Sequence, residues 1–175
     1  MPIKISTPIT HETLKGLKAG DSVLISGTIY TARDAAHKRL TEELAKGIKP
    51  PVDIENITIY YAGPSPAKPG QVIGSCGPTT SGRMDAYAPT LISLGQTAMI
   101  GKGERTGEVV DAMKKYGAVY FGAIGGAGAL IAKSITSAEV VAYDDLGTES
   151  IRKLTVVDFP ATVIIDCTGK SLYDR

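Results

Sequence analysis

Three cationic side chains lie where the sequence predicts that a helix begins. They are Arg33, which precedes an aspartate, Arg83, which follows a glycine, and Lys102, which stands between two glycines. The N-terminus of a helix is already positive, because its peptide dipoles are aligned and its first N–H groups are unpaired. A cation at such a place favours an anion beside it. Three of them predict a site for a substrate with more than one carboxylate or phosphate group.

The most unusual stretch is residues 77–83, Gly-Pro-Thr-Thr-Ser-Gly-Arg. Its two glycines allow the backbone to approach a ligand closely. Its three consecutive hydroxyls, Thr79, Thr80 and Ser81, precede a predicted helix, and one of them is enough to cap it. The others are candidates for substrate hydrogen bonds. They are also candidates for proton transfer beside Arg83, where cationic surroundings lower the cost of an alkoxide.

Two further features of the cationic set leave alternatives open. Arg33 and His37 are four residues apart and share a helix face, which fits either a binding site or a solvated basic face. His37 either orients a ligand or a loop, or is a buried histidine with a satisfied ring. Lys102 fits carboxylate binding from an open loop, but a plain surface lysine fits the same sequence.

The elements that must position these residues alternate between strands and helices. The pattern indicates a single α/β domain over residues 1–175. Thr31 and Asp34 have the spacing of a capping box at the start of the second helix. The glycine run at 125–128 lacks the spacing of a dinucleotide loop, so it favours close strand–helix packing or a subunit contact. We expect helices at 11–19, 31–46, 83–94 and 106–116 and one after residue 128, and strands at 22–27, 57–62, 98–100, 118–124, 140–143, 154–157 and 161–166.

Composition restricts the partners and the compartment. Nineteen basic against eighteen acidic residues give a net charge of +1, so we expect no nucleic-acid or membrane partner and only local anion binding. The start of the chain lacks signal-peptide features, and no apolar run reaches membrane-spanning length, so a cytoplasmic protein is expected. Cys76 and Cys167 match neither a zinc pattern nor a disulfide framework and are interpreted as small buried hydrophobes.

Three strings carry a resemblance to a known family: residues 27–37, 77–85 and 100–103. They resemble the signature segments of the β subunit, or C-terminal domain, of class I (iron–sulfur) fumarate hydratases and of the related L-tartrate dehydratases. Residues 60–64, 119–126, 158–160 and 166–173 add to it. The similarity covers nearly the whole chain, and several long motifs occur in the family's order.

The resemblance implies a swivelling β/β/α domain that closes over a [4Fe–4S] cluster on a separate, cysteine-bearing α subunit. Two cysteines are too few to hold such a cluster in this chain, so no metal ligands are expected here. In the family, the open iron of the cluster binds the substrate as a Lewis acid.

The family motifs also imply roles for individual residues. Arg33, Arg83 and Lys102 would bind the two carboxylates, and Thr79 would be the hydroxyl that exchanges the C3 proton. Thr80 and His37 would also contact the substrate. The acid that acts on the leaving hydroxyl would come from the α subunit.

The sequence is therefore interpreted as the β subunit of an iron–sulfur hydro-lyase that hydrates fumarate reversibly to malate. L-tartrate dehydration is the alternative reaction, because cationic residues do not report the hydroxyl pattern between two carboxylates. A non-catalytic anion-binding module is the alternative of another class. The expected assembly is a dimer of αβ pairs, or a β homodimer when the chain is isolated.

Overall fold

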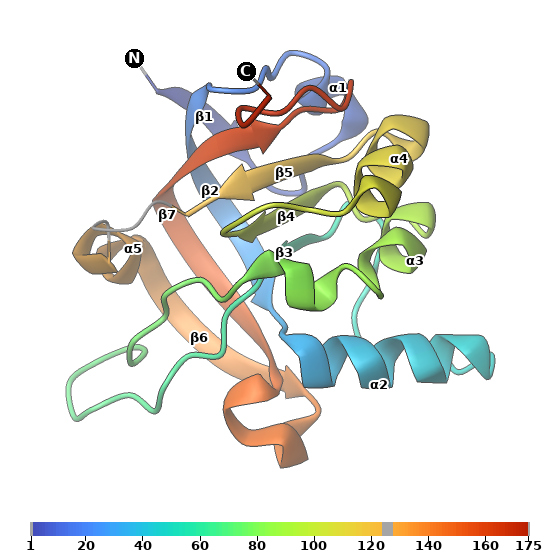
Figure 1. Ribbon diagram of the computed structural model, residues 1–175. Coiled ribbons are helices and arrows are strands. Elements are labelled where there is room, and N and C mark those ends of the chain that lie inside the picture. Colours follow the sequence, from blue (N-terminus) through green and yellow to red (C-terminus); the bar gives the residue numbers. More distant parts are fainter. Residues whose placement is uncertain (1, 124–127, 175) are drawn as a thin grey trace.

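The structure is a computed structural model that describes residues 2–123 and 128–174 (Figure 1). Its strands are β1 (Ile3–Ser6), β2 (Ser22–Thr31), β3 (Thr58–Tyr60), β4 (Ala98–Gly101), β5 (Val119–Gly122), β6 (Ile135–Ala142) and β7 (Ile151–Ile165). Its α-helices are α1 (His11–Leu14), α2 (Asp34–Ala45), α3 (Ala88–Ser93), α4 (Gly107–Tyr116) and α5 (Gly128–Ser134). Two 3₁₀ helices are η1 (Ser81–Met84) and η2 (Asp144–Glu149).

The strands form a mixed barrel of five, β2-β3-β4-β5-β7. β2, β3, β4 and β5 run parallel to one another, and β7 pairs antiparallel with both β5 and β2, which closes the barrel. β1 extends the sheet beside the first half of β2, and β6 extends it beside the first half of β7. The chain is therefore a mixed α/β domain, as the alternation of elements predicts.

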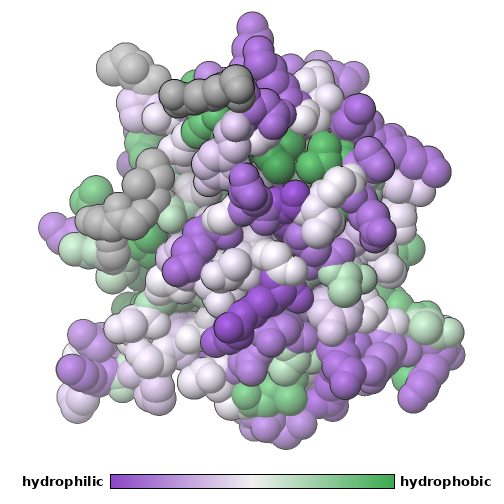
Figure 2. Space-filling view, in the orientation of Figure 1, coloured by the Kyte–Doolittle hydropathy of each residue, from purple (hydrophilic) through white to green (hydrophobic). Residues whose placement is uncertain are grey.

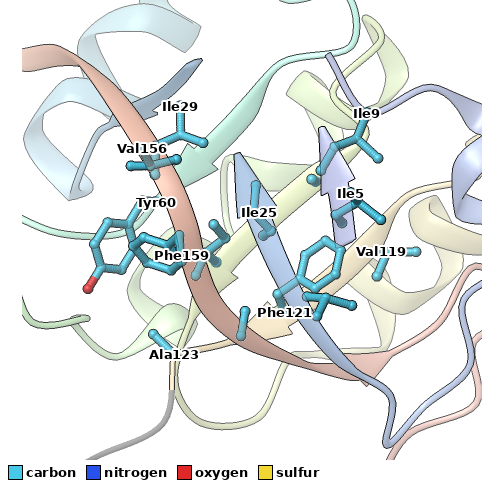
Figure 3. Close-up of a cluster of buried hydrophobic side chains, with 14 of the residues drawn as sticks. Ile5, Ile9, Ile25, Ile29, Tyr60, Val119, Phe121, Ala123, Val156 and Phe159 are labelled. Carbon is cyan, nitrogen blue, oxygen red and sulfur yellow. The ribbon is translucent and has the colours of Figure 1, made fainter. Parts of the chain in front are cut away.

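Alternate side chains along the strands belong to two different hydrophobic clusters. Tyr60, Ile100 and Phe121 lie in the cluster inside the barrel, together with Ile25 and Phe159 (Figure 3). The preceding residues, Ile59, Met99 and Tyr120, belong to the second cluster outside it. Successive side chains of a strand point to opposite faces, so both faces of these short strands are buried.

Helices α2, α3 and α4 cover the outer face of the parallel strands (Figure 1). Leu40, Leu91 and Met113 are fully buried against that face. α5 contacts β7 on the other side of the molecule. Among the described residues, no helix is both long and apolar enough to cross a bilayer.

The predicted capping box is wrong. Thr31 is the last residue of β2, where it pairs with Tyr60 of β3 and Arg152 of β7. α2 begins at Asp34 with Arg33 in the cap position, and no side chain caps it. The strand pairings of Thr31 outweigh its local capping preference.

Two predicted helix starts are also wrong. The helix expected at 83–94 is the short turn η1 followed, after a break, by α3, so Arg83 lies in the last turn of η1. Lys102 directly follows β4, and α4 begins only at Gly107. α4 itself ends at Tyr116, just before Gly117, as predicted. Of the three cations, Arg33 alone stands at the N-terminus of an α-helix among the described residues.

Strands 154–157 and 161–166 are one strand, β7. Val157 and Asp158 form a bulge opposite Ser26 of β2, because the register shifts between Ile25 and Gly27. The N–H of Asp158 donates to Ser26 Oγ at 3.0 Å, and Asp158 has a φ of 55°. Residues 158–160, which separated the two predicted strands, therefore belong to one continuous strand that contains a bulge. The glycine run at 125–128 lies mostly outside the described residues.

Candidate functional site

The C-terminal ends of the parallel strands bring two of the predicted cations to one edge of the barrel. Arg33 follows β2 and Lys102 follows β4, with β3 between the two strands. The pairing extends past the strands, because Ala32 donates to Tyr60 and Tyr61 donates to Ile100 through the backbone. Loops that leave this edge are therefore neighbours, although Arg33 and Lys102 are far apart in sequence.

The Thr79–Ser81 segment is held at the same edge by its backbone. The N–H of Thr79 donates to Tyr61 O at 2.7 Å, and the N–H of Ser81 donates to Lys102 O at 2.9 Å. The approach is close, because a Cβ at Gly101 would lie 2.1 Å from Ser81 Oγ. Thr80 and Ser81 thus lie directly beside Lys102, and Thr79 and Arg83 belong to the same segment.

Arg33 lies at the beginning of α2 with its guanidinium between acidic neighbours. Its Nε is 3.6 Å from Asp34 Oδ1 and 3.9 Å from Glu149 Oε1, both beyond hydrogen-bond distance. The side chain packs on Gly63, where a Cβ would come within 2.8 Å of Arg33 Cδ. About a quarter of the side chain is exposed (26%). No acceptor among the described residues takes a hydrogen bond from this guanidinium.

Glu149 is a residue of this edge that sequence reasoning missed. Its Oε1 accepts the N–H of Ala35 at 3.2 Å, so a carboxylate of the chain itself lies at the N-terminus of α2. Part of the positive potential that the sequence assigns to an external anion is therefore compensated internally. Ala35 and Glu149 are 114 positions apart in the sequence, so no local signal predicts this contact.

His37 is fully buried beneath Arg33. Its Nδ1 lies 2.8 Å from Arg33 O, and because a carbonyl only accepts, Nδ1 carries the proton. Nε2 is buried and has no partner among the described residues. The ring meets Tyr61 edge to face, with centroids 5.5 Å apart. Burial lowers the pKa of His37 to about 4, so the ring is neutral at pH 7.

The remaining predicted side chains are accessible. Thr80, Arg83 and Lys102 are exposed and Thr79 is half-buried. Within the described parts of the chain, none of these four side chains makes a hydrogen bond or ion pair. Figure 2 shows that the face seen in Figure 1 is mostly hydrophilic, with small hydrophobic areas. The edge therefore offers cationic and hydroxyl donors that are free to bind an anion.

A second missed residue, Arg105, lies under this edge. Its side chain is 0% exposed and its Nε donates to Asp85 Oδ1 at 2.6 Å. Its Nη2 donates to Tyr61 Oη at 3.2 Å. The sequence presents Arg105 as one more charged residue in a polar loop, and only the fold shows that it is buried.

The described residues do not fit an iron–sulfur cluster. They contain no group of three or more His, Cys, Asp or Glu side chains placed to hold a metal ion. Cys76 is buried, and burial raises the pKa of its thiol to about 12, which disfavours the thiolate that a metal requires. The Sγ of Cys167 faces Leu14 O at 3.9 Å.

Comparison with known proteins identifies the family. A sequence model described as Fumarase C-terminus matches residues 1–175. The chain belongs to this family.

Some of the similar proteins are named as fumarate hydratases and one as a tartrate dehydratase subunit. Fumarate hydratase 2 of Leishmania major is 38% identical over 99% of the chain and 31% of its own length. Fumarate hydratase class I, aerobic, of Escherichia coli (strain K12) is 44% identical over 86% of the chain and 28% of its own length. The putative L(+)-tartrate dehydratase subunit beta of Methanocaldococcus jannaschii is 40% identical over 95% of the chain and 89% of its own length. The chain thus spans about three tenths of the two fumarate hydratases.

Proposed function

We propose that this chain is the β subunit of a two-subunit, [4Fe–4S]-dependent hydro-lyase that hydrates fumarate reversibly to malate. One observation carries the proposal: Arg33, Lys102 and residues 79–83 lie at one edge of the barrel. Apart from Ser81, whose hydroxyl bonds to Tyr120, no described residue accepts a hydrogen bond from the side-chain donors of this set. Such an edge suits a small dianion. The similarity to fumarate hydratases supplies the reaction, which the cationic edge alone does not specify.

The cations would divide the two carboxylates between them. Arg33 and Arg83 present planar guanidinium forks that match a carboxylate in two parallel hydrogen bonds, whereas Lys102 acts as a mobile point charge. Thr80 would add a hydroxyl donor beside Lys102, its partner in a short parallel β-bridge. His37 would act through Arg33, whose carbonyl it holds, because its own ring is buried.

Thr79 would serve as the base-side hydroxyl. In malate dehydration, its oxygen would take the C3 proton, while the C2 hydroxyl leaves with a proton from an acid of the α subunit. Hydration runs the same transfers backwards. A threonine hydroxyl is a weak base in water, but nearby Arg83 and Lys102 would stabilise the alkoxide that it needs.

The cluster would reside on a cysteine-bearing α subunit, because the residues of this chain do not fit it. The Methanocaldococcus relative is named as a subunit beta, which supports a two-subunit assembly. We place the partner over the exposed cationic edge, reached by a swivelling motion of this domain. The pairs would associate as a dimer of αβ pairs.

L-tartrate dehydration is the second candidate. It is favoured by the same relative, of whose length the alignment covers 89%. Malate and tartrate, the substrates of the two dehydrations, are dicarboxylates that differ only in a hydroxyl at C3, so the same cations would serve either reaction.

The test is anaerobic co-expression of this chain with its α partner, followed by parallel assays of fumarate hydration and L-tartrate dehydration. We expect activity in the purified pair and none in either subunit alone, with a higher kcat/KM for fumarate. A higher value for tartrate would select the second candidate. A chain that forms no such complex and binds dicarboxylates without turnover would identify the anion-binding module.

A further inference from the structure

Arg105 joins the two loops that carry the proposed site. It belongs to the loop between β4 and α4, three residues after Lys102. Its partner Asp85 directly follows η1, the turn that contains Arg83. The other oxygen of Asp85 accepts the N–H of Thr106 at 2.8 Å, so one carboxylate holds the Lys102 loop twice.

A tyrosine on each side completes the cluster. The guanidinium lies 5.1 Å from the Tyr61 ring centroid and 4.8 Å from that of Tyr120. The Tyr120 hydroxyl donates to Gly103 O at 2.8 Å, so it accepts the proton of Ser81 Oγ, also at 2.8 Å. Tyr61 in turn supplies the carbonyl that binds the Thr79 N–H. Through these contacts the cluster reaches both ends of the Thr79–Arg83 segment.

Stability alone is a weak reason for a buried ion pair at this position. Removing two charges from water costs energy that their attraction often fails to return, and apolar replacements of such pairs are frequently neutral or stabilising. The contacts of Arg105 instead hold several segments in a fixed relative position. Its hydrogen-bonded side-chain partners, Asp85, Tyr61 and Met99, belong to or adjoin the segments that form the cationic edge.

We propose that Arg105 is a positioning residue, which fixes the Thr79–Arg83 segment against the Lys102 loop and so sets the spacing between proton transfer and carboxylate binding. The inference rests on the proposed function for its catalytic consequence only. Its structural content concerns this chain alone. A misplacement of about 1 Å between such groups costs roughly a hundredfold in rate, which makes the spacing consequential.

The first test measures amide hydrogen exchange in the isolated chain. Arg105→Lys keeps the charge but loses the fork, and we expect exchange at the Thr79 and Ser81 amides to rise at least about tenfold. Amides in the β2–β7 pairing should be unchanged. Arg39→Lys is the matched control, because Arg39 pairs with Asp145 at 2.8 Å and stacks on Tyr143 at the surface. Equal protection of Thr79 and Ser81 in both variants would overturn the proposal.

Tyr120→Phe covers the case in which Arg105→Lys does not fold. It removes only the hydroxyl between Ser81 and Gly103 and keeps the ring. We expect the Ser81 amide to exchange faster in this variant, while the β2–β7 amides again do not change. Wild-type exchange at Ser81 would count against the cluster as the device that holds the segment.

The second test measures the reconstituted pair well below the unfolding temperature. We expect Arg105→Lys to lower kcat by about tenfold or more, and to lower it far less when Thr79 is already alanine. If Arg105 only stabilises the fold, kcat of Arg105→Lys should be unchanged while the chain stays folded. A loss of kcat in the Thr79→Ala background as large as in the wild-type background would also indicate a role in stability alone. Inactivity of the wild-type pair would refute the proposed function instead, and the exchange data would still decide the positioning role.

Discussion

Thr79 is held through its backbone, which leaves its side chain uncommitted. Its N–H is bonded to Tyr61 O, and no described residue engages its hydroxyl. The backbones of Arg83 and Lys102 are likewise hydrogen-bonded, and their side chains have no partner among residues 2–123 and 128–174. This arrangement separates the positioning of the groups from their chemistry. Substitution of a side chain at this edge should therefore affect turnover or binding more than folding.

Thr79→Ala tests that separation in the reconstituted pair. We expect kcat for fumarate hydration to fall by about a hundredfold or more, as for loss of a proton-transfer group, with little change in KM. Thr90→Ala is the control, since Thr90 is an exposed threonine of α3 outside the cationic edge. Steady-state kinetics measure both constants for the two variants. A wild-type kcat in Thr79→Ala would show that this hydroxyl takes no part in the mechanism.

His37 should make the stability of the chain depend on pH. The pKa of His37 is about 4 in the folded chain, whereas an ordinary histidine has a pKa of 6.5. Between these values the unfolded chain binds a proton at His37 and the folded chain does not. Stability is complete above pH 6.5 and falls as the pH drops towards 4. The loss from this group between pH 7.5 and 5 should be about 2 kcal/mol.

Urea unfolding at the two pH values measures this loss. His37→Gln removes the titrating ring, so its own change in unfolding free energy over the same interval should be smaller by that amount. An identical pH dependence in the two proteins would show that His37 is not the buried neutral base described here.

Among the helices and strands, the sequence predicted those whose bounds depend on local interactions. The helix expected at 106–116 is α4, which begins one residue later, at Gly107. The start of α2 was missed because Thr31 and its pairings with Tyr60 and Arg152 extend β2. The two C-terminal strands appeared separate because a bulge opposite Ser26 is defined by the partner strand and not by the sequence around it.

The same distinction applies to the cationic edge. Residue type and spacing predicted Arg33, Arg83 and Lys102, and the family resemblance singled out Thr79 among the three hydroxyls. The backbone of the fold places these four positions at one edge. The reason given for two of them, a helix N-terminus, was wrong, because Arg83 and Lys102 lie in a 3₁₀ turn and after a strand. Contacts made across the fold, such as that of Glu149 with the start of α2, could not be predicted from local pattern.

Gly101 tests how the segment and the strand fit together. The methyl of Gly101→Ala would meet Ser81 Oγ and displace the segment, which should lower kcat/KM and reduce stability by about 1–3 kcal/mol. Gly107→Ala is the control, because a Cβ there meets nothing within 4 Å. Thermal unfolding and kinetics on both variants would test this, and a Gly101→Ala chain that matches the control would contradict the close approach.

At the scale of the molecule, closure of the barrel lets distant loops form one surface. β7 joins β5 to β2, so the parallel strands between them have no free edge at which their ends could separate. The interior cluster of Figure 3 packs the inside of the barrel beneath these strands. Arg83 and Lys102 are exposed at the edge, where the subunit proposed above could reach them.

In the proposed assembly, this chain would supply the substrate site and its partner would supply the cluster. We would test this division by measuring iron content and fumarate kinetics on the same preparations of the pair, with Arg83→Lys compared against Arg39→Lys. We predict equal iron in both pairs and a kcat/KM lower by about tenfold to a hundredfold in Arg83→Lys only, from the lost guanidinium fork. Unchanged kinetics in Arg83→Lys, or activity lost in proportion to iron, would contradict the claim.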